Sequence, residues 1–148
     1  MTKTLLKKSI VVASHNRGKI KEFKSLFSRY NVKITTSSSI GIEEVDETGK
    51  TFEENALLKA KSIPEGLISL SDDSGLCIKA LKDEPGILSA RFARNCGGWY
   101  EAMRKLYEKI KINNLNSTDA KFVSVIALRW EDSSLSIFRG EINGFISW

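Results

Sequence analysis

The segment that most constrains the fold is residues 9–27, because its hydrophobic pattern changes from one kind to another within a few residues. Residues 9–13 are a continuous apolar run, which is typical of a short strand buried on both faces. A polar turn follows at residues 14–18, and then apolar side chains recur at helical spacing up to Phe27. A second short strand at residues 32–35 completes a strand, loop, helix and strand. The pattern predicts an α/β protein in which this helix connects two strands of one sheet.

The rest of the chain predicts a mixed, twisted sheet flanked by helices. Thr51 and Glu54 have the spacing of a capping box, and the helix they begin should end near Pro64. We expect the acids Asp72 and Asp73 at the carboxyl end of the next strand. The further expected elements are a loop at residues 37–49, a strand at 67–71, a strand or turn at 76–81, a turn at 85–86, an irregular segment at 91–98, a helix at 99–110 and a hairpin of strands 121–130 and 135–146.

Length and composition predict one folded domain over residues 1–148, because a chain of 148 residues can bury a core without disulfides or structural metal. No apolar run approaches the ~20 residues that a membrane span needs, and residues 5–8 do not form a secretory signal. The expected location is the cytoplasm. Cys77 and Cys96 lack metal-ligand spacing and are expected to be reduced thiols.

Charge is distributed unevenly along the chain. Residues 1–33 hold nine Lys or Arg against the single acid Glu22, whereas residues 43–54 hold six acids against Lys50. Each run by itself is best explained as a solvated face. The basic balance also fits a nucleic-acid binder, but no nucleic-acid-binding motif is present, so we do not expect nucleic acid as a partner.

The first candidate site is Ser14-x-Asn16-x-x-Lys19-x-x-Glu22 at the junction of strand and helix. Free N–H groups at a helix N-terminus, short polar side chains and a lysine could together bind phosphate. The alternative is an ordinary capped helix with an exposed lysine, and the segment alone does not decide between them. A P-loop is excluded, because the upstream glycine is absent and Ile20 replaces the metal-binding Ser or Thr.

Two acidic segments are further candidates. Adjacent carboxylates at Asp72 and Asp73 are tolerated best where a cation neutralises them, although for this segment taken alone an Asp-Ser-Gly turn is the preferred explanation. Glu47 could add another carboxylate, or could be a solvated loop acid. His15 is the only histidine, which excludes sites built on several histidines, and we expect it to face solvent.

Four motifs in order carry a family resemblance. They are Ser14-x-Asn16-x-x-Lys19-x-x-Glu22, then Glu47-Thr48-Gly49-x-Thr51-Phe52-x-Glu54-Asn55-Ala56-x-x-Lys59-Ala60, then Asp72-Asp73-Ser74-Gly75-Leu76, then Pro85-Gly86-Ile87-x-Ser89-Ala90-Arg91. From about Ile10 to the last residue, the chain resembles the inosine triphosphate pyrophosphatase family, which hydrolyses deaminated purine nucleoside triphosphates (ITP, dITP and XTP).

The resemblance implies roles for these residues. Asp73 would be the general base, and Glu47 and Asp73 would hold Mg²⁺ as the cofactor. Asp72, Glu22 and Lys59 would support the site. A purine nucleoside triphosphate would be the substrate and a homodimer the assembly. The residues implied to contact the substrate are Ser14, His15, Asn16, Arg17, Gly18, Lys19 and Ser74.

The end of the chain departs from the family pattern. After a strand like residues 135–148, family members continue with a glycine-rich segment ending in Tyr-Asp-Pro, and later a Lys and a Ser-His-Arg that hold the purine base. None of these is present here. We therefore expect a domain that is incomplete at its C-terminus, exposed apolar surface on the last hairpin, and weakened or lost activity. The alternative is a non-catalytic remnant or nucleotide-binding module of the same fold.

Overall fold

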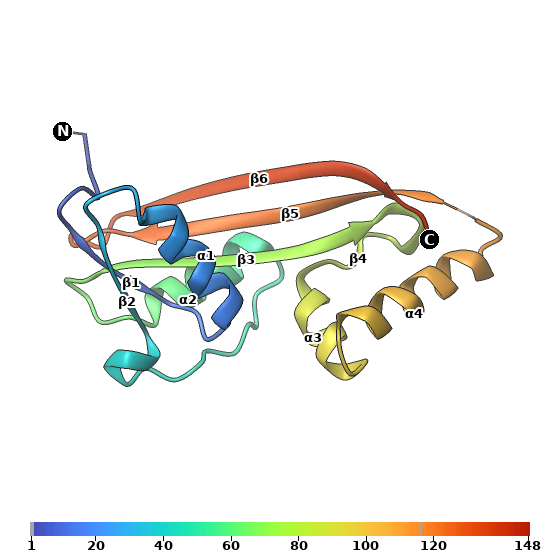
Figure 1. Cartoon of the computed structure of the whole chain (residues 1–148), viewed down its shortest axis with the longest axis horizontal. Coiled ribbons are helices and arrows are strands. Elements are labelled where there is room, and N and C mark those ends of the chain that lie inside the picture. Colours follow the sequence, from blue (N-terminus) through green and yellow to red (C-terminus); the bar gives the residue numbers. More distant parts are fainter. Residues whose placement is uncertain (1, 116) are drawn as a thin grey trace. The chain divides into compact units, whose positions relative to one another are not determined.

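The computed structural model describes residues 2–115 and 117–148 and confirms the mixed α/β class. Within that part of the chain, six strands form one sheet in the order β2-β1-β3-β5-β6, with β4 paired to β3 (Figure 1). The strands are β1 (Ser9–Val12), β2 (Lys33–Thr36), β3 (Ile68–Ile78), β4 (Glu84–Pro85), β5 (Thr118–Arg129) and β6 (Leu135–Ile146). The helices are α1 (Arg17–Phe27), α2 (Phe52–Lys61), α3 (Ser89–Asn95) and α4 (Trp99–Ile112), with short 3-10 turns at Ser38–Ile40, Lys79–Leu81 and Gly86–Leu88.

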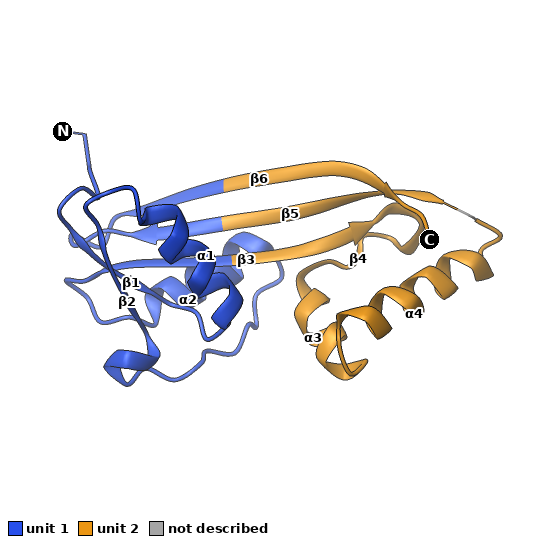
Figure 2. Ribbon diagram, in the orientation of Figure 1, with its two compact units in different colours: residues 1–72, 126–138 blue, residues 73–125, 139–148 orange. Residues whose placement is uncertain are grey.

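The chain divides into two compact units. Unit 1 comprises residues 1–72 and 126–138, and unit 2 comprises residues 73–125 and 139–148 (Figure 2). The boundary falls within β3, between Asp72 and Asp73. Each unit has a hydrophobic core of its own, and the prediction of a single domain stays a prediction.

In unit 1 the helices α1 and α2 cover opposite faces of the parallel strands. Ile10 and Val12 of β1 pack with Phe23 of α1, whereas Val11 and Ala13 pack with Ile63, just after α2. Neighbouring side chains in a strand point to opposite faces, so these two clusters lie on the two sides of the sheet. The parallel pairing of β1 with β2 and β3 confirms the strand, helix and strand predicted from residues 9–35.

Polar side chains of the sheet hold α2 along its length. The hydroxyl of Ser71 donates to the carbonyl of Ala56, and the hydroxyl of Ser69 donates to that of Ala60 at 2.8 Å. Beyond the helix, the guanidinium of Arg129 donates to the carbonyls of residues 63 and 64. All three donors are buried. Because the acceptors lie at successive positions along α2 and just after it, α2 cannot slide along the sheet without breaking these hydrogen bonds.

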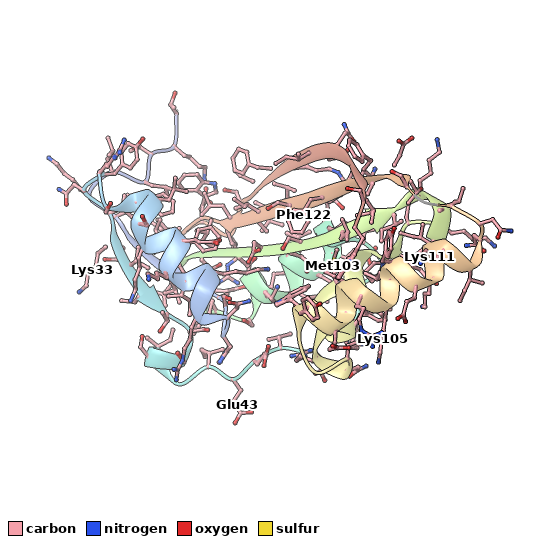
Figure 3. All side chains as sticks on the ribbon, turned by 45° about the vertical axis from the view of Figure 1, so that its right-hand side comes forward. Lys33, Glu43, Met103, Lys105, Lys111 and Phe122 are labelled. Carbon is pink, nitrogen blue, oxygen red and sulfur yellow. The ribbon has the colours of Figure 1, made fainter. Side chains whose placement is uncertain are left out.

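In unit 2, α3 and α4 pack on their own part of the sheet. Ile78, Leu106 and Ile110 form the buried cluster, and Met103 of α4 packs against it (Figure 3). The predicted helix at residues 99–110 is therefore confirmed, with its stripe of apolar residues facing the strands. Trp99, at the start of this stripe, is exposed.

The expected end of a strand at Asp72 is wrong. β3 runs without a break through Asp72, Asp73, Ser74 and Gly75 to Ile78. Its pairing with β1 does end close to the acids, at Leu70 opposite Val12. Asp72 thus follows the parallel part of the strand, although the strand itself continues.

The continuation of β3 depends on a contact that the local sequence does not contain. A Cβ on Gly75 would lie 2.1 Å from the carbonyl oxygen of Gly86 and 2.8 Å from the hydroxyl of Ser89. That hydroxyl accepts the N–H of Leu76 at 3.0 Å and donates to the Gly86 carbonyl. The strand is therefore extended through Gly75 by a turn that packs directly on its backbone.

The expected irregular segment at residues 91–98 is also wrong, because residues 89–95 form helix α3. Ala93 is buried, and Phe92 packs against the core of unit 2. A helix this short has too few apolar residues to show a period in the sequence.

The last hairpin carries exposed apolar side chains, as expected. Phe138, Ile142 and Phe145 of β6 are 59%, 75% and 71% exposed. Phe122 of β5 is about half exposed (Figure 3). β6 is the last strand of the sheet in the order given above.

Candidate active site

The N-terminus of α1 is an internally hydrogen-bonded turn. Asn16 is the N-cap residue, and its side-chain oxygen accepts the N–H groups of Gly18 at 2.9 Å and Lys19 at 3.2 Å. The hydroxyl of Ser14 accepts the N–H of Asn16 at 3.1 Å. The turn after β1 is thus preformed by its own short polar side chains.

Lys19 joins this turn to the acidic strand. Its Nζ lies 2.7 Å from Oδ2 of Asp72, and the exposed side-chain fractions are 27% for Lys19 and 8% for Asp72. The other carboxylate oxygen of Asp72 is buried and has no hydrogen-bond partner among the described residues. The alternative prediction, an ordinary capped helix with an exposed lysine, is therefore incomplete, because the lysine pairs with a buried carboxylate.

A second ion pair lies between the acidic loop and α2. Nζ of Lys59 is 3.0 Å from Oε1 of Glu47, with exposed side-chain fractions of 14% and 33%. This contact gives Lys59 a defined partner, for which the sequence offered no role. Glu47 is a paired, half-buried acid and not a freely solvated one.

The predicted capping box at the start of α2 is confirmed in one half and altered in the other. The hydroxyl of Thr51 accepts the N–H of Glu54 at 3.1 Å, as expected. The carboxylate of Glu54 accepts the N–H of Lys50 at 2.6 Å, one residue before the position of the standard motif. The acidic loop is thereby attached to the first turn of the helix.

Asp73 and Ser74 belong to unit 2. Asp73 is 4% exposed, and one of its carboxylate oxygens accepts the N–H of Ser74 at 3.1 Å. Ser74 itself is half-buried. Asp73 is thus held in β3 with little access to bulk solvent.

The remaining predicted residues lie at the surface of unit 1. His15 is exposed as expected, and its Nε2 lies 3.4 Å from the hydroxyl of Ser37. Arg17 and Gly18 are the first residues of α1, and both are exposed. Glu22 lies exposed in the next turn of α1.

The carboxylates fit the general requirements of Mg²⁺. Among residues 2–115 and 117–148, no group of three or more His, Cys, Asp or Glu could hold a metal ion. Mg²⁺ is usually bound by one or two carboxylates together with substrate phosphates, not by a protein cage. The donors at Glu47, Asp72 and Asp73 are hard oxygen ligands, and the buried oxygen of Asp72 that lacks a partner is suited to a cation or water.

No structural role was predicted from the sequence for two residues of this region, Asn55, which appears there only as part of a motif, and Arg129. Asn55 is 1% exposed on α2, and its side-chain oxygen accepts the N–H of Gly49 at 2.8 Å. Arg129 is 5% exposed and holds the segment after α2. Asn55 sits beside Ala56 on the apolar stripe of a helix, and a polar residue in that place is the signal that could have revealed it.

Comparisons with known proteins agree with the resemblance. The model of the Ham1 family matches residues 10–148, so the chain belongs to the Ham1 family. A dITP/XTP pyrophosphatase of Rhizobium meliloti is 40% identical over 97% of this chain and 71% of that protein. A dITP/XTP pyrophosphatase of Staphylococcus aureus is 42% identical over 95% of this chain and 71% of that protein.

Solved structures show the same fold. A HAM1 protein from Coxiella burnetii matches with a TM-score of 0.80 and 34% identity, over 93% of this chain and 72% of that chain. The Ham1 protein of Staphylococcus aureus matches with a TM-score of 0.74 and 38% identity, over 95% of this chain and 72% of that chain. The predicted fold class is thereby confirmed. In the described part of this chain, no helix has both the length and the apolar character to cross a membrane.

Proposed function

We propose that this chain hydrolyses deaminated purine nucleoside triphosphates, such as ITP, dITP and XTP, to the nucleoside monophosphate and pyrophosphate, with Mg²⁺ as cofactor. Membership of the Ham1 family supports this proposal, as do relatives that are named dITP/XTP pyrophosphatases. Such a reaction removes deaminated nucleotides from the nucleotide pool.

The observation that carries the proposal is the contact between Lys19 and Asp72. It joins two motifs that lie far apart in the sequence, one at the N-terminus of α1 and one after the parallel part of β3. A lysine in the first turn of a helix is placed to receive an anion, because the helix N-terminus already favours negative charge. Phosphate could replace Asp72 as the partner of Lys19.

The proposed reaction is the attack of water on the α-phosphorus. The oxygen of the water forms a bond to that phosphorus, the anhydride bond between the α- and β-phosphates breaks, and pyrophosphate leaves. Asp73 accepts the proton of the water as general base. Lys19 stabilises the negative charge of the phosphates as it develops. When bound, Mg²⁺ supplies neutralisation of the phosphate charge, with Glu47 and Asp73 as its proposed ligands.

The direct test is to incubate the purified chain with ITP and Mg²⁺ and to measure the pyrophosphate released. Asp73→Asn should abolish the release, because the amide cannot accept the proton. Asp119→Asn is the matched control, since Asp119 is an exposed acid of the same unit. Loss of release in both variants, or in neither, would contradict the role proposed for Asp73.

Binding without hydrolysis would indicate the alternative function. A ligand that binds the folded state raises the melting temperature by mass action. If ITP with Mg²⁺ raises the melting temperature but no pyrophosphate appears, the chain is a nucleotide-binding module. If neither effect is seen, it is a non-catalytic remnant of the family.

We also propose a homodimer in the cytoplasm, with no nucleic acid as partner. The homodimer rests on the family resemblance, and sedimentation of the purified chain over a range of concentrations tests it. Binding of a random oligonucleotide at low salt would contradict the expected absence of nucleic acid.

A further inference from the structure

Asn55 makes an unusual contact for a residue inside a helix. Its side chain is almost completely buried, and its oxygen points back to the N–H of Gly49, in the loop before α2. A buried amide is unfavourable unless it is hydrogen-bonded, so this contact accounts for the presence of Asn at that position.

The loop is shaped to allow this contact. A Cβ on Gly49 would lie 2.6 Å from the side-chain oxygen of Asn55 and 2.7 Å from Cβ of Glu54. Only glycine lets the loop backbone approach the helix so closely. The next N–H of the loop, that of Lys50, is held by the carboxylate of Glu54. Two successive peptide groups are therefore fixed to the first turns of α2.

Glu47 lies two residues before Gly49, and the same helix holds its side chain. Lys59, which pairs with Glu47, follows Asn55 by one helical turn. α2 thus fixes the loop at two positions. The side chain of Asn55 accepts the backbone N–H of Gly49, and the ammonium of Lys59 pairs with the carboxylate of Glu47. The helix is in turn held to the sheet by Ser69 and Ser71.

We propose that Asn55 is a positioning residue, which holds Glu47 in place for the cation through the backbone of Gly49. This inference rests on the proposed function, in which Glu47 is a ligand of Mg²⁺. The buried amide fixes the loop before substrate arrives, so that the carboxylate needs only to exchange the ammonium of Lys59 for the metal.

The test compares Asn55→Ala with Ser69→Ala in the full chain. Both substitutions remove one hydrogen bond that a buried side chain makes to or from α2, but only the first releases the loop. The first measurement is exchange of the Lys50 amide by NMR without metal or nucleotide. Its acceptor, Glu54, is unchanged in both variants. We expect about tenfold faster exchange in Asn55→Ala only.

The second measurement is the Mg²⁺ concentration for half-maximal pyrophosphate release at a fixed ITP concentration. We expect an increase of about tenfold in Asn55→Ala, as for other residues that orient a metal ligand, with a smaller change in kcat at saturating Mg²⁺. Asn55→Asp keeps the acceptor oxygen and should restore the Mg²⁺ dependence, even if the buried charge lowers the melting temperature. Ser69→Ala should leave the Mg²⁺ dependence unchanged.

Two results would overturn the inference. One is exchange of the Lys50 amide that is the same in Asn55→Ala and Ser69→Ala. The other is a Mg²⁺ dependence that shifts equally in both variants, since that would be a general effect of lower stability. If the wild-type chain releases no pyrophosphate, the proposed function fails by itself, and the amide exchange still decides whether Asn55 holds the loop.

Discussion

Lys19→Met should destabilise the protein in the absence of any ligand, because it leaves the carboxylate of Asp72 buried without its counter-ion. The two charged atoms lie 2.7 Å apart, and the side chain of Asp72 is only 8% exposed. At an effective dielectric constant of about 20, their Coulomb attraction is about 6 kcal/mol. Desolvation of both groups offsets much of this attraction.

The net coupling between the two residues should therefore be about 1–3 kcal/mol. Lys19 is 27% exposed, so solvent screens part of the attraction and the lower half of this range is favoured. A double-mutant cycle of Lys19→Met, Asp72→Asn and the combined variant isolates this coupling from the effect of each substitution alone.

Urea unfolding without nucleotide or metal is the appropriate assay, because it measures the free energy of unfolding of the ligand-free protein. Each single variant should be less stable than wild type, and the double variant should be more stable than the sum of the two losses predicts. A coupling energy within about 0.5 kcal/mol of zero would refute the argument. The ion pair would then be a weak surface contact, and the proposed exchange of Asp72 for phosphate would lose its basis.

Three further predictions concern other parts of the chain. Gly75→Ala should unfold or strongly destabilise the protein, because the new Cβ would lie 2.1 Å from a backbone carbonyl oxygen. Gly140→Ala is the control, because a Cβ there would meet no atom within 4 Å, and it should leave the melting temperature nearly unchanged. Equal melting temperatures for the two variants would be the contrary result. Arg129→Met should lower the free energy of unfolding in urea by about 2–3 kcal/mol, because the buried carbonyl of Ile63 and the partly buried carbonyl of Pro64 lose their donor; a loss below about 0.5 kcal/mol would count against this. Burial is the main cause that raises the pKa of the Cys77 thiol, and a nearby acid raises it further. At pH 8, iodoacetamide should therefore modify Cys96 first and Cys77 only after unfolding, which mass spectrometry can measure. Faster modification of Cys77 than of Cys96 would contradict this explanation of the reactivity of the two thiols.

The parts of the fold that were predicted correctly depend on local signals. The apolar run of β1, the polar turn after it and the helical spacing of α1 all lie within residues 9–27, and each signal acts between near neighbours. The cap at Thr51 is equally local, because its hydroxyl reaches an N–H three residues away. The motifs of the candidate site were also found in this way, since each is a short run of residues.

The incorrect predictions concern residues whose conformation depends on contacts from elsewhere in the chain. A strand end was expected at Asp72 and Asp73, because acids and glycine usually mark a turn. In the structure, Gly75 has the conformation of a strand because the backbone of Gly86 packs on it. That contact comes from a segment elsewhere in the chain, and no local pattern reports it.

By itself, the sequence determined the class of the fold, the motifs and the family, because each is recorded in the type and spacing of nearby residues. Only the tertiary structure decided which of these residues meet. Lys19 pairs with Asp72, and Lys59 pairs with Glu47. The side chain of Asn55 accepts the N–H of Gly49. Such contacts arise when segments pack together and exclude water, whether the segments are neighbours in the sequence, as at Gly49 and Asn55, or far apart, as at Lys19 and Asp72. Burial then makes each unpaired polar group costly. The pairing of charges and hydrogen bonds in this site is therefore a property of the folded chain, not of any single segment.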